Sequence, residues 1–250
     1  MDLQLDGKRA LVTGGSRGIG KAIARVLASE GARVAIAARD AERLAAAAED
    51  IGAASGSQVA TARFEAGNDD SVRAMVATVA DALGGIDILI NNAAEPGGTA
   101  PPNLAAVTTA DFTTDMNIKV MGYLRCAQHA APMMAANGWG RIVNIGGLTA
   151  YGTANMLSSM RVIAVASLTK NLADELGPSG VTVNLVHPGT TRTERISDER
   201  AALAAQNVIG RMVDAEEIAW LVAFLCSPKS NSITGESIGC GGGIPGVIRY

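Results

Sequence analysis

The sequence predicts a single α/β domain over residues 1–250, built as a doubly wound parallel sheet with helices on both faces. Three observations predict this fold: short apolar runs alternate with helical patterns, the chain has 250 residues, and no change in composition marks a second domain. Alternating strands and helices are typical of a parallel sheet covered on both sides. Apolar residues make up 48% of the chain but aromatic residues only 3%, so Ala, Val, Ile and Leu must form the core.

The strands are predicted where short aliphatic runs are bounded by polar or glycine positions, the pattern of a strand that is buried on both faces. Residues 86–90, for example, are continuously apolar except for Asp87. The predicted strands are residues 9–12, 33–38, 58–64, 86–90, 140–145, 181–186 and 237–240.

The helices are predicted where apolar residues recur with helical period between these strands. Residues 41–51 form an Ala-rich example, with Glu42, Arg43, Glu49 and Asp50 on the solvent face. Residues 190–211 carry the least pattern and are interpreted as a flap over the pocket. The predicted helices are residues 19–30, 41–51, 70–83, 111–136, 158–176 and 216–225.

The bulk composition argues against several classes of function. The net charge is −3 and no long basic run appears, so neither nucleic acid nor an anionic membrane is expected as a partner. The sequence contains no signal peptide and no apolar run of the roughly 20 residues that a membrane span needs. The cysteines and histidines show no metal-ligand spacing, so no metal and no disulfide are expected, and a reducing cytoplasmic location is predicted. These residues are Cys126, Cys226, Cys240, His129 and His187.

A glycine-rich loop directly follows the first predicted strand and begins the first helix. Glycine permits a tight turn and lets backbone N–H groups approach a pyrophosphate, while the helix N-terminus offers free donors and a partial positive charge. This loop in a strand–helix–strand context predicts a Rossmann-type dinucleotide site. The loop reads Thr13-Gly14-Gly15-Ser16-Arg17-Gly18-Ile19-Gly20, in which Gly14, Ser16, Arg17, Gly18, Ile19 and Gly20 are the predicted cofactor contacts.

The end of the second strand favours NADP(H) over NAD(H). NAD-binding members of such folds place an acidic side chain there for the ribose hydroxyl, whereas NADP-binding ones use a basic group for the 2′-phosphate. Here Ala38 stands at the acidic position, and Arg39 follows it and could hold the phosphate with two hydrogen bonds. Arg17 would add a second positive charge. Two alternatives stay open: Arg39 as an ordinary surface charge, and Asp40 as a ribose contact for NAD(H).

With its Gly-x-x-x-Gly-x-Gly spacing, the chain resembles the short-chain dehydrogenase/reductase family, whose signature is TGxxxGIG. Further motifs follow in the family's order over nearly the whole chain. The resemblance implies an oxidoreductase that acts on a small carbonyl or alcohol, and it implies cofactor contacts from Asn91, Ala93, Pro188, Gly189, Thr193 and, near the adenine, Glu65. The matching segments are Asn91-Asn92-Ala93-Ala94, Asn117 within Met116-Asn117-Ile118, Pro188-Gly189 with Thr193, Gly235, and Gly241-Gly242.

The catalytic positions depart from this family. The resemblance implies four groups: an asparagine, a serine for the substrate carbonyl, a tyrosine for proton transfer, and a lysine that lowers the pKa of the tyrosine. Asn117 is retained, but Gly147 stands at the serine position. Counting back from Thr169-Lys170 places Ser158 at the tyrosine position and Val162 at the lysine position. Counting forward from Gly147 gives residues 160 and 164 instead, Met and Ala, so neither count finds a tyrosine or a lysine.

Three interpretations of this departure stay open. The first is an oxidoreductase that uses substitute groups, with Tyr151, Ser158 and Arg161 as candidates. The second is a catalytically inactive protein that binds the dinucleotide in a regulatory or structural role. The third is a different reaction on the same scaffold, in which His187 could act as an acid or base. Tyr151, Arg161 and His187 each also have an ordinary structural interpretation, as a loop anchor, a surface or interface charge, and a hydrogen-bonded residue at a strand end.

A homodimer or homotetramer is expected. The resemblance implies an interface on the long helices predicted over residues 111–136 and 158–176. The second of these is apolar almost all round near its start, as expected of a helix buried on several sides.

Overall fold

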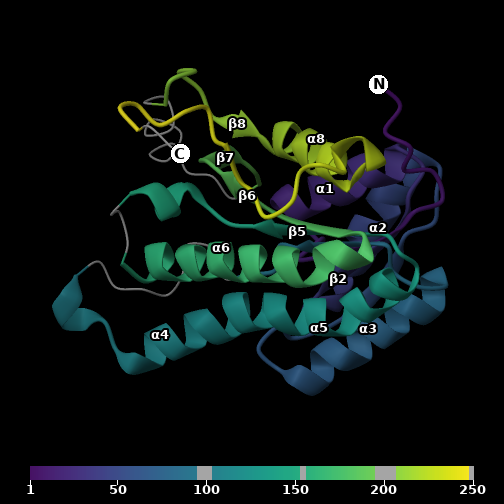
Figure 1. Cartoon of the computed structure of the whole chain (residues 1–250), viewed down its shortest axis with the longest axis horizontal. Coiled ribbons are helices and arrows are strands. Elements are labelled where there is room, and N and C mark those ends of the chain that lie inside the picture. Colours follow the sequence, from purple (N-terminus) through teal and green to yellow (C-terminus); the bar gives the residue numbers. More distant parts are fainter. Residues whose placement is uncertain (95–102, 153–155, 195–206, 248–250) are drawn as a thin grey trace.

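The computed structural model describes residues 1–94, 103–152, 156–194 and 207–247, and it confirms the predicted doubly wound α/β fold (Figure 1). Seven parallel strands form one sheet in the order β3-β2-β1-β4-β5-β6-β9. The strand order reverses between β1 and β4, and the crevice outside such a switch point is where ligands bind in open α/β sheets. The strands are β1 (Arg9–Thr13), β2 (Arg33–Ala38), β3 (Ala60–Arg63), β4 (Ile88–Asn91), β5 (Gly140–Ile145), β6 (Val181–Pro188) and β9 (Ser237–Cys240).

Helices cover both faces of this sheet. The core on one face joins α1, α2 and α8 to the sheet, and the core on the other joins α3, α5 and α6 to it (Figure 1). The helices are α1 (Gly18–Ser29), α2 (Ala41–Ser55), α3 (Asp69–Leu83), α4 (Thr109–Met116), α5 (Gly122–Ala136), α6 (Met156–Leu176) and α8 (Ala215–Cys226). Short 3₁₀ turns cover Leu104–Ala106, Leu148–Tyr151, Gly177–Ser179 and Pro228–Ser230. Among the described residues, none of these helices has the length and apolar character needed to cross a bilayer.

The two cores explain why the strands read as continuous apolar runs. Along β1, Ala10 and Val12 pack into the core of α1, α2 and α8, whereas Leu11 between them packs into the core of α3 and α5. Successive side chains of a strand point to opposite faces, so a strand with a core on each side needs apolar residues at every position.

The helix predicted over residues 111–136 contains a local change of winding. It runs as α4, then a π-helical turn over Asn117–Met121, then α5. π turns are rare overall, and those that do occur are often found at functional sites. This one lies at the carboxyl edge of the sheet, and its residues Ile118 and Lys119 line the cavity described below.

The stretch predicted as a flap, residues 190–211, lies in large part outside the described residues. Its described beginning, β7 (Thr191–Arg192), pairs in parallel with β8 (Val213–Asp214). This two-stranded sheet holds the chain on either side of residues 195–206 against the carboxyl edge of the main sheet.

Candidate functional site

A cavity of about 1230 Å³ runs along the carboxyl edge of the sheet, from the end of β2 to the first turns of α6. The glycine-rich loop after β1 forms one wall, and the loops after β4, β5 and β6 form the others. The predicted cofactor residues that line it are Gly14, Ser16, Arg17, Gly18, Ile19, Gly20, Arg39, Glu65, Ala93, Pro188, Gly189 and Thr193. The sequence motifs therefore converge on one open space.

The glycine-rich loop is held tightly against the end of β4. Gly14 has φ +66°, and a Cβ there would lie 2.8 Å from the side-chain nitrogen of Asn92. A Cβ on Gly20 would overlap the carbonyl oxygen of Gly14. The Asn92 amide donates to the carbonyl oxygens of Thr13, at 3.1 Å, and of Gly14, at 3.2 Å. The glycines are thus required by backbone packing, and Asn92 fixes the loop although the sequence argument gave it no separate role.

The N-terminus of α1 binds a carboxylate in this structure. Its N-cap residue, Arg17, makes no side-chain capping hydrogen bond. Instead, the N–H of Gly18 points at the side chain of Glu194, whose two oxygens lie 3.2 and 3.4 Å away. The free donors of a helix N-terminus attract anions. The Glu194 carboxylate shows that this helix N-terminus accepts negative charge.

The side chains at the end of β2 include the predicted Ala38 and Arg39, and also Arg43, which was not predicted to reach the cavity. Ala38 and Arg39 both line the cavity, so no acidic side chain occupies the last position of the strand. Asp40 lines the cavity too, but its carboxylate accepts from the N–H of Arg43 at 3.0 Å and thereby caps α2. The guanidinium of Arg43 lies 3.4 Å from the same carboxylate and also lines the cavity. From the sequence alone, Arg43 is expected only on the solvent face of its helix.

At the other end of the cavity, the structure brings together Gly147, Ser158, Arg161 and Val162. Ser158 and Val162, from the count back from Thr169-Lys170, both line the cavity, whereas Met160 of the other count is 46% exposed. A Cβ on Gly147 would find only ordinary contacts, 3.8 Å or more away, with Thr149 and Val162. Room for a serine therefore exists where the chain has a glycine.

Arg161 is buried in a polar cluster. Its guanidinium pairs with the carboxylate of Asp115 at 2.5 Å and lies 3.4 Å from the hydroxyl of Ser158, which in turn lies 3.1 Å from that of Thr149. The Nε of Arg161 and the Oδ2 of Asp115 have no hydrogen-bond partner among the described residues. Such a buried pair is costly to break, because the remaining charge is left without compensation.

Lys119, which the sequence argument did not single out, lies in the same end of the cavity. Its side chain is buried within the π turn, and its ammonium lies 3.4 Å from the carbonyl oxygen of Gly146 and 5.6 Å from the centre of the Tyr123 ring. Burial, together with the nearby Arg161 guanidinium, lowers the pKa of Lys119 from 10.5 to about 7, and Asp115 opposes this shift. The only signal in the sequence was the i, i+4 spacing of Asp115 and Lys119, which places both on one side of a helix.

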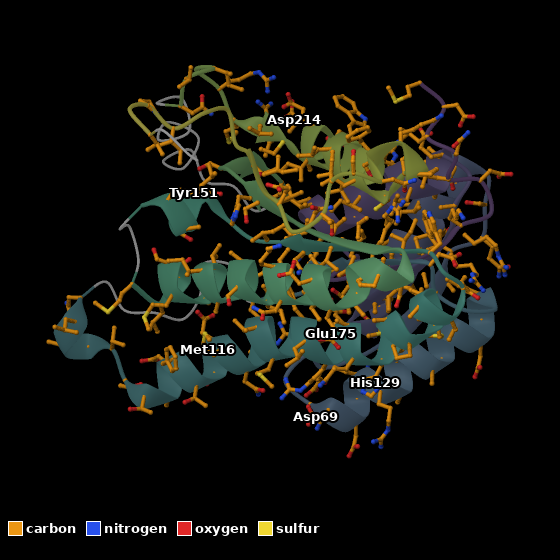
Figure 2. All side chains as sticks on the ribbon, viewed as in Figure 1. Asp69, Met116, His129, Tyr151, Glu175 and Asp214 are labelled. Atoms are coloured by element: carbon orange, nitrogen blue, oxygen red, sulfur yellow. The ribbon has the colours of Figure 1, made fainter. Side chains whose placement is uncertain are left out.

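Asn117 and Asn91 occupy supporting positions. The side chain of Asn117 donates to the carbonyl oxygen of Gly67 at 3.1 Å and accepts from Arg125 at 2.8 Å. Arg125 also pairs with Asp69, at the start of α3 beside α5 (Figure 2). Neither asparagine is among the residues that line the cavity: Asn91 is fully buried, and its amide donates to Asn144 and to the Tyr123 carbonyl oxygen.

Tyr151 and His187 lie behind the loop that follows β5. Tyr151 ends the short turn after β5 (Figure 2), and its ring meets that of His187 edge-on, with 5.0 Å between centroids. Both line a separate hollow of about 370 Å³ rather than the main cavity. The Nδ1 of His187 lies 2.9 Å from the carbonyl oxygen of Gly147. Their contacts fit the structural interpretations, a loop anchor and a hydrogen-bonded residue at a strand end.

No metal centre is apparent in the parts of the chain that the structure describes, where no three His, Cys, Asp or Glu side chains cluster. Burial raises the pKa of the Cys126 and Cys226 thiols to about 12, so both are inert, protonated core residues at neutral pH.

Comparison with known proteins finds similarity to reductases over nearly the whole chain. Residues 14–245 match a family model described as enoyl-(acyl carrier protein) reductase. A 3-oxoacyl-(acyl-carrier-protein) reductase of Vibrio cholerae is 38% identical over 97% of this chain and 99% of its own.

Solved structures agree with this similarity. A short-chain dehydrogenase of Burkholderia cenocepacia in complex with NADP is 38% identical, with a TM-score of 0.87 over 96% of this chain and 98% of its own. L-Sorbose reductase of Gluconobacter frateurii, complexed with NADPH and L-sorbose, is 28% identical, with a TM-score of 0.92 over 99% of this chain and 100% of its own. Both neighbours hold the kind of cofactor that the sequence predicts for this chain.

Proposed function

The chain belongs to the short-chain dehydrogenase/reductase family, and we propose that it is an NADP(H)-dependent oxidoreductase that acts on a small carbonyl or alcohol through an atypical catalytic site. The observation that carries this proposal is the continuity of the cavity. One space joins an anion-accepting helix N-terminus at Gly18 to a buried polar cluster around Ser158 and Arg161. A protein that only held the nucleotide would not need buried charge at the far end.

The residues of the cavity fit the nucleotide. The glycine-rich loop and the α1 N-terminus would hold the pyrophosphate, in place of the Glu194 carboxylate. Arg17, Arg39 and Arg43 would surround the 2′-phosphate of the adenosine, where Ala38 offers no competing acid. Pro188, Gly189 and Thr193 would border the nicotinamide end. When bound, the reduced cofactor supplies a hydride.

The proposed catalytic site is atypical because three of the family's four groups are replaced. Gly147 stands for the serine, Ser158 for the tyrosine and Val162 for the lysine, and Asn117 alone is retained. Asn117 holds the start of the π turn through its side-chain hydrogen bonds. Ser158, together with the neighbouring Arg161, offers donors to a substrate oxygen. A serine hydroxyl is too weak an acid to replace a tyrosine, so the proton must come from another group of the cluster.

We also propose that the protein is a homodimer or homotetramer that uses α5 and α6. Met156, Met160 and Ile163 lie on one side of α6, at spacings of four and three residues, and each is about half exposed. A stripe of this kind on a long helix fits a second copy of the chain. Light scattering on the purified protein, with Ile163→Glu as the disrupting variant, tests it.

The function is tested in two steps with the purified protein. Fluorescence titration with NADPH and with NADH measures cofactor binding, and oxidation of bound NADPH is then followed with acetoacetyl-CoA and a panel of small ketones and ketoses. We expect tighter binding of NADPH and turnover of at least one probe. Binding without turnover of any probe over the pH range would instead support a catalytically inactive dinucleotide-binding protein.

A further inference from the structure

Resting on the proposed oxidoreductase function, we propose that Lys119 is the residue that exchanges the proton with the substrate oxygen, and that the Arg161–Asp115 ion pair positions it and sets its charge. Lys119 thereby takes the role that a tyrosine has elsewhere in the family. The substrate is then a ketone or aldehyde whose oxygen lies at the closed end of the cavity, between Lys119 and Ser158.

The place of the ammonium supports this assignment. Lys119 lines the same end of the cavity as Gly146, Gly147, Ser158 and Arg161. Its Nζ lies 3.4 Å from the carbonyl oxygen of Gly146, the residue just before the position where the family has its carbonyl-binding serine. Lys119 belongs to the π turn, and its ammonium is directed at the carbonyl oxygen of Gly146, which directly follows β5.

The charges around Lys119 leave it poorly compensated. Two cations, Lys119 and Arg161, share this buried end with one carboxylate, Asp115, and that carboxylate pairs with Arg161. From α5, Tyr123 presents its ring to Lys119, and its hydroxyl donates to the carbonyl oxygen of Ile145. Among the described residues Lys119 forms no ion pair. Burial disfavours its charged form, so the ammonium gives up its proton readily.

The other polar groups at this end are less suited to proton transfer. An arginine keeps its proton in proteins, which excludes Arg161 as the donor. A serine hydroxyl such as Ser158 is a hydrogen-bond donor but a very weak acid. Tyr151 and His187 line the separate hollow behind the loop after β5. Lys119 is the described residue that combines access to the cavity with a pKa near neutrality.

The proton step balances as follows for carbonyl reduction. As the carbonyl carbon receives a hydride, the π electron pair of the C=O bond moves to the oxygen. An N–H bond of the Lys119 ammonium breaks and an O–H bond forms, which leaves an alcohol and a neutral lysine amine. The amine then regains a proton from water that enters the open cavity. In alcohol oxidation the neutral amine accepts the hydroxyl proton in the reverse step.

The first test reads the protonation of Lys119 without catalysis. The chain has five lysines, Lys8, Lys21, Lys119, Lys170 and Lys229. They are dimethylated reductively with ¹³C-formaldehyde, and their NMR signals are followed from pH 5 to 11. The α-amine of Met1 is labelled as well and titrates at about pH 7 to 8, so we expect two signals to titrate near neutrality, far below the other four lysines, and only one of the two to be absent from Lys119→Met. Titration of Lys119 together with the other lysines would overturn the proposal, and so would failure of the reagent to reach it.

The second test reads catalysis with whichever carbonyl probe the wild-type protein reduces. Lys119→Met should lower kcat by roughly 100-fold or more, the usual scale of acid–base catalysis, while NADPH binding stays within about threefold. Lys119→Arg, which keeps the charge but cannot release the proton, should be equally slow. The matched control is Lys229→Met at an exposed lysine, which should leave kcat unchanged. Full activity in Lys119→Met overturns only the role of Lys119 and leaves the proposed function standing. A wild-type protein that binds NADPH but reduces no probe overturns the oxidoreductase proposal itself.

The positioning role of Asp115 has its own readout. Asp115→Asn removes the carboxylate that opposes the shift of the Lys119 pKa, so the Lys119 NMR signal and the pH profile of kcat should move together to lower pH. An unchanged profile in a folded variant would exclude this role. Should Asp115→Asn fail to fold, Asp115→Glu replaces it, and a displaced profile in that variant supports the role while an unchanged one excludes it.

Discussion

Replacing Lys119 by methionine should stabilise the protein, and by more in acid than in base. Burial lowers the pKa of Lys119 from 10.5 to about 7 in the folded chain. Between these two values the unfolded chain carries the proton and the folded chain does not, so wild-type stability rises with pH over this window. Below pH 7 the full cost of the shift applies, and above 10.5 none of it does.

The size of the effect follows from the shift. At about 1.4 kcal/mol per pKa unit, burial of the charged lysine costs about 5 kcal/mol at pH 6 and only about 1.4 kcal/mol at pH 9.5. Methionine fills a similar volume and carries no charge. The stability gained from Lys119→Met should therefore be larger at pH 6 than at pH 9.5 by up to about 3 kcal/mol, and water that enters the open cavity will reduce this difference to roughly 1–3 kcal/mol.

The assay is urea unfolding of both proteins at pH 6.0, 7.5 and 9.5, at one protein concentration so that any oligomer contributes equally. Other titrating groups cancel because both chains contain them. Lys229→Met, at an exposed lysine, should give a pH-independent difference near zero. The reasoning about Lys119 is refuted if its variant is destabilised at pH 6, or if the difference between the two proteins is the same at all three pH values.

Three further predictions concern the cavity. Arg39→Ala should weaken NADPH binding roughly tenfold and leave NADH binding unchanged, because it removes a charge-assisted contact with the 2′-phosphate; fluorescence titration decides this, and an equal loss for both nucleotides would count against the NADP(H) assignment. Glu194→Gln should tighten NADPH binding roughly two- to fivefold by removing a carboxylate that competes for the α1 N-terminus, whereas Glu216→Gln on α8 should have no effect. Gly147→Ser should leave the melting temperature within about 2 °C of wild type, because a Cβ fits there, and should raise kcat/KM with the carbonyl probe about tenfold by adding a donor to the carbonyl; a lower kcat/KM would show that the site does not use this position.

Much of the fold follows from local pattern. The strands of a sheet with a core on each face must be apolar at every position, so apolar runs such as residues 86–90 indicated them directly. The observed β4 (Ile88–Asn91) begins two residues and ends one residue later than that predicted strand. The π turn inside residues 111–136 had no such signal, because it changes the winding of a helix without changing its apolar period.

Most of the residues predicted for the cofactor end line one cavity for the same reason. Backbone geometry dictates residue type there: Gly14 needs a positive φ, and Gly20 must approach the carbonyl of Gly14. A loop with these backbone requirements can be recognised from the positions of its glycines in the sequence. The motif also contained Asn92, but its role in tying the loop to β4 depends on two strands that are far apart in sequence.

The catalytic end was only partly predictable. Motif spacing indicated Ser158 and Arg161, which the structure places in the cavity. Tyr151 was a candidate only by its nearness to Gly147 in the sequence, and its ring lies in the separate hollow with His187. Lys119 was overlooked because a lysine in an amphipathic helix usually faces solvent. Its burial depends on how α4, the π turn and α6 pack together.

The sequence by itself determined the sheet, the family and the glycine-rich loop of this protein, because each rests on local rules of period and backbone geometry. Only the tertiary structure decided which charges meet at the far end of the cavity. The Arg161–Asp115 pair joins residues 46 positions apart, and Lys119 owes its shifted pKa to burial between them and Gly146. Desolvation of these groups and the proximity of their charges exist only once the helices have packed, so no pattern in the sequence could have predicted them.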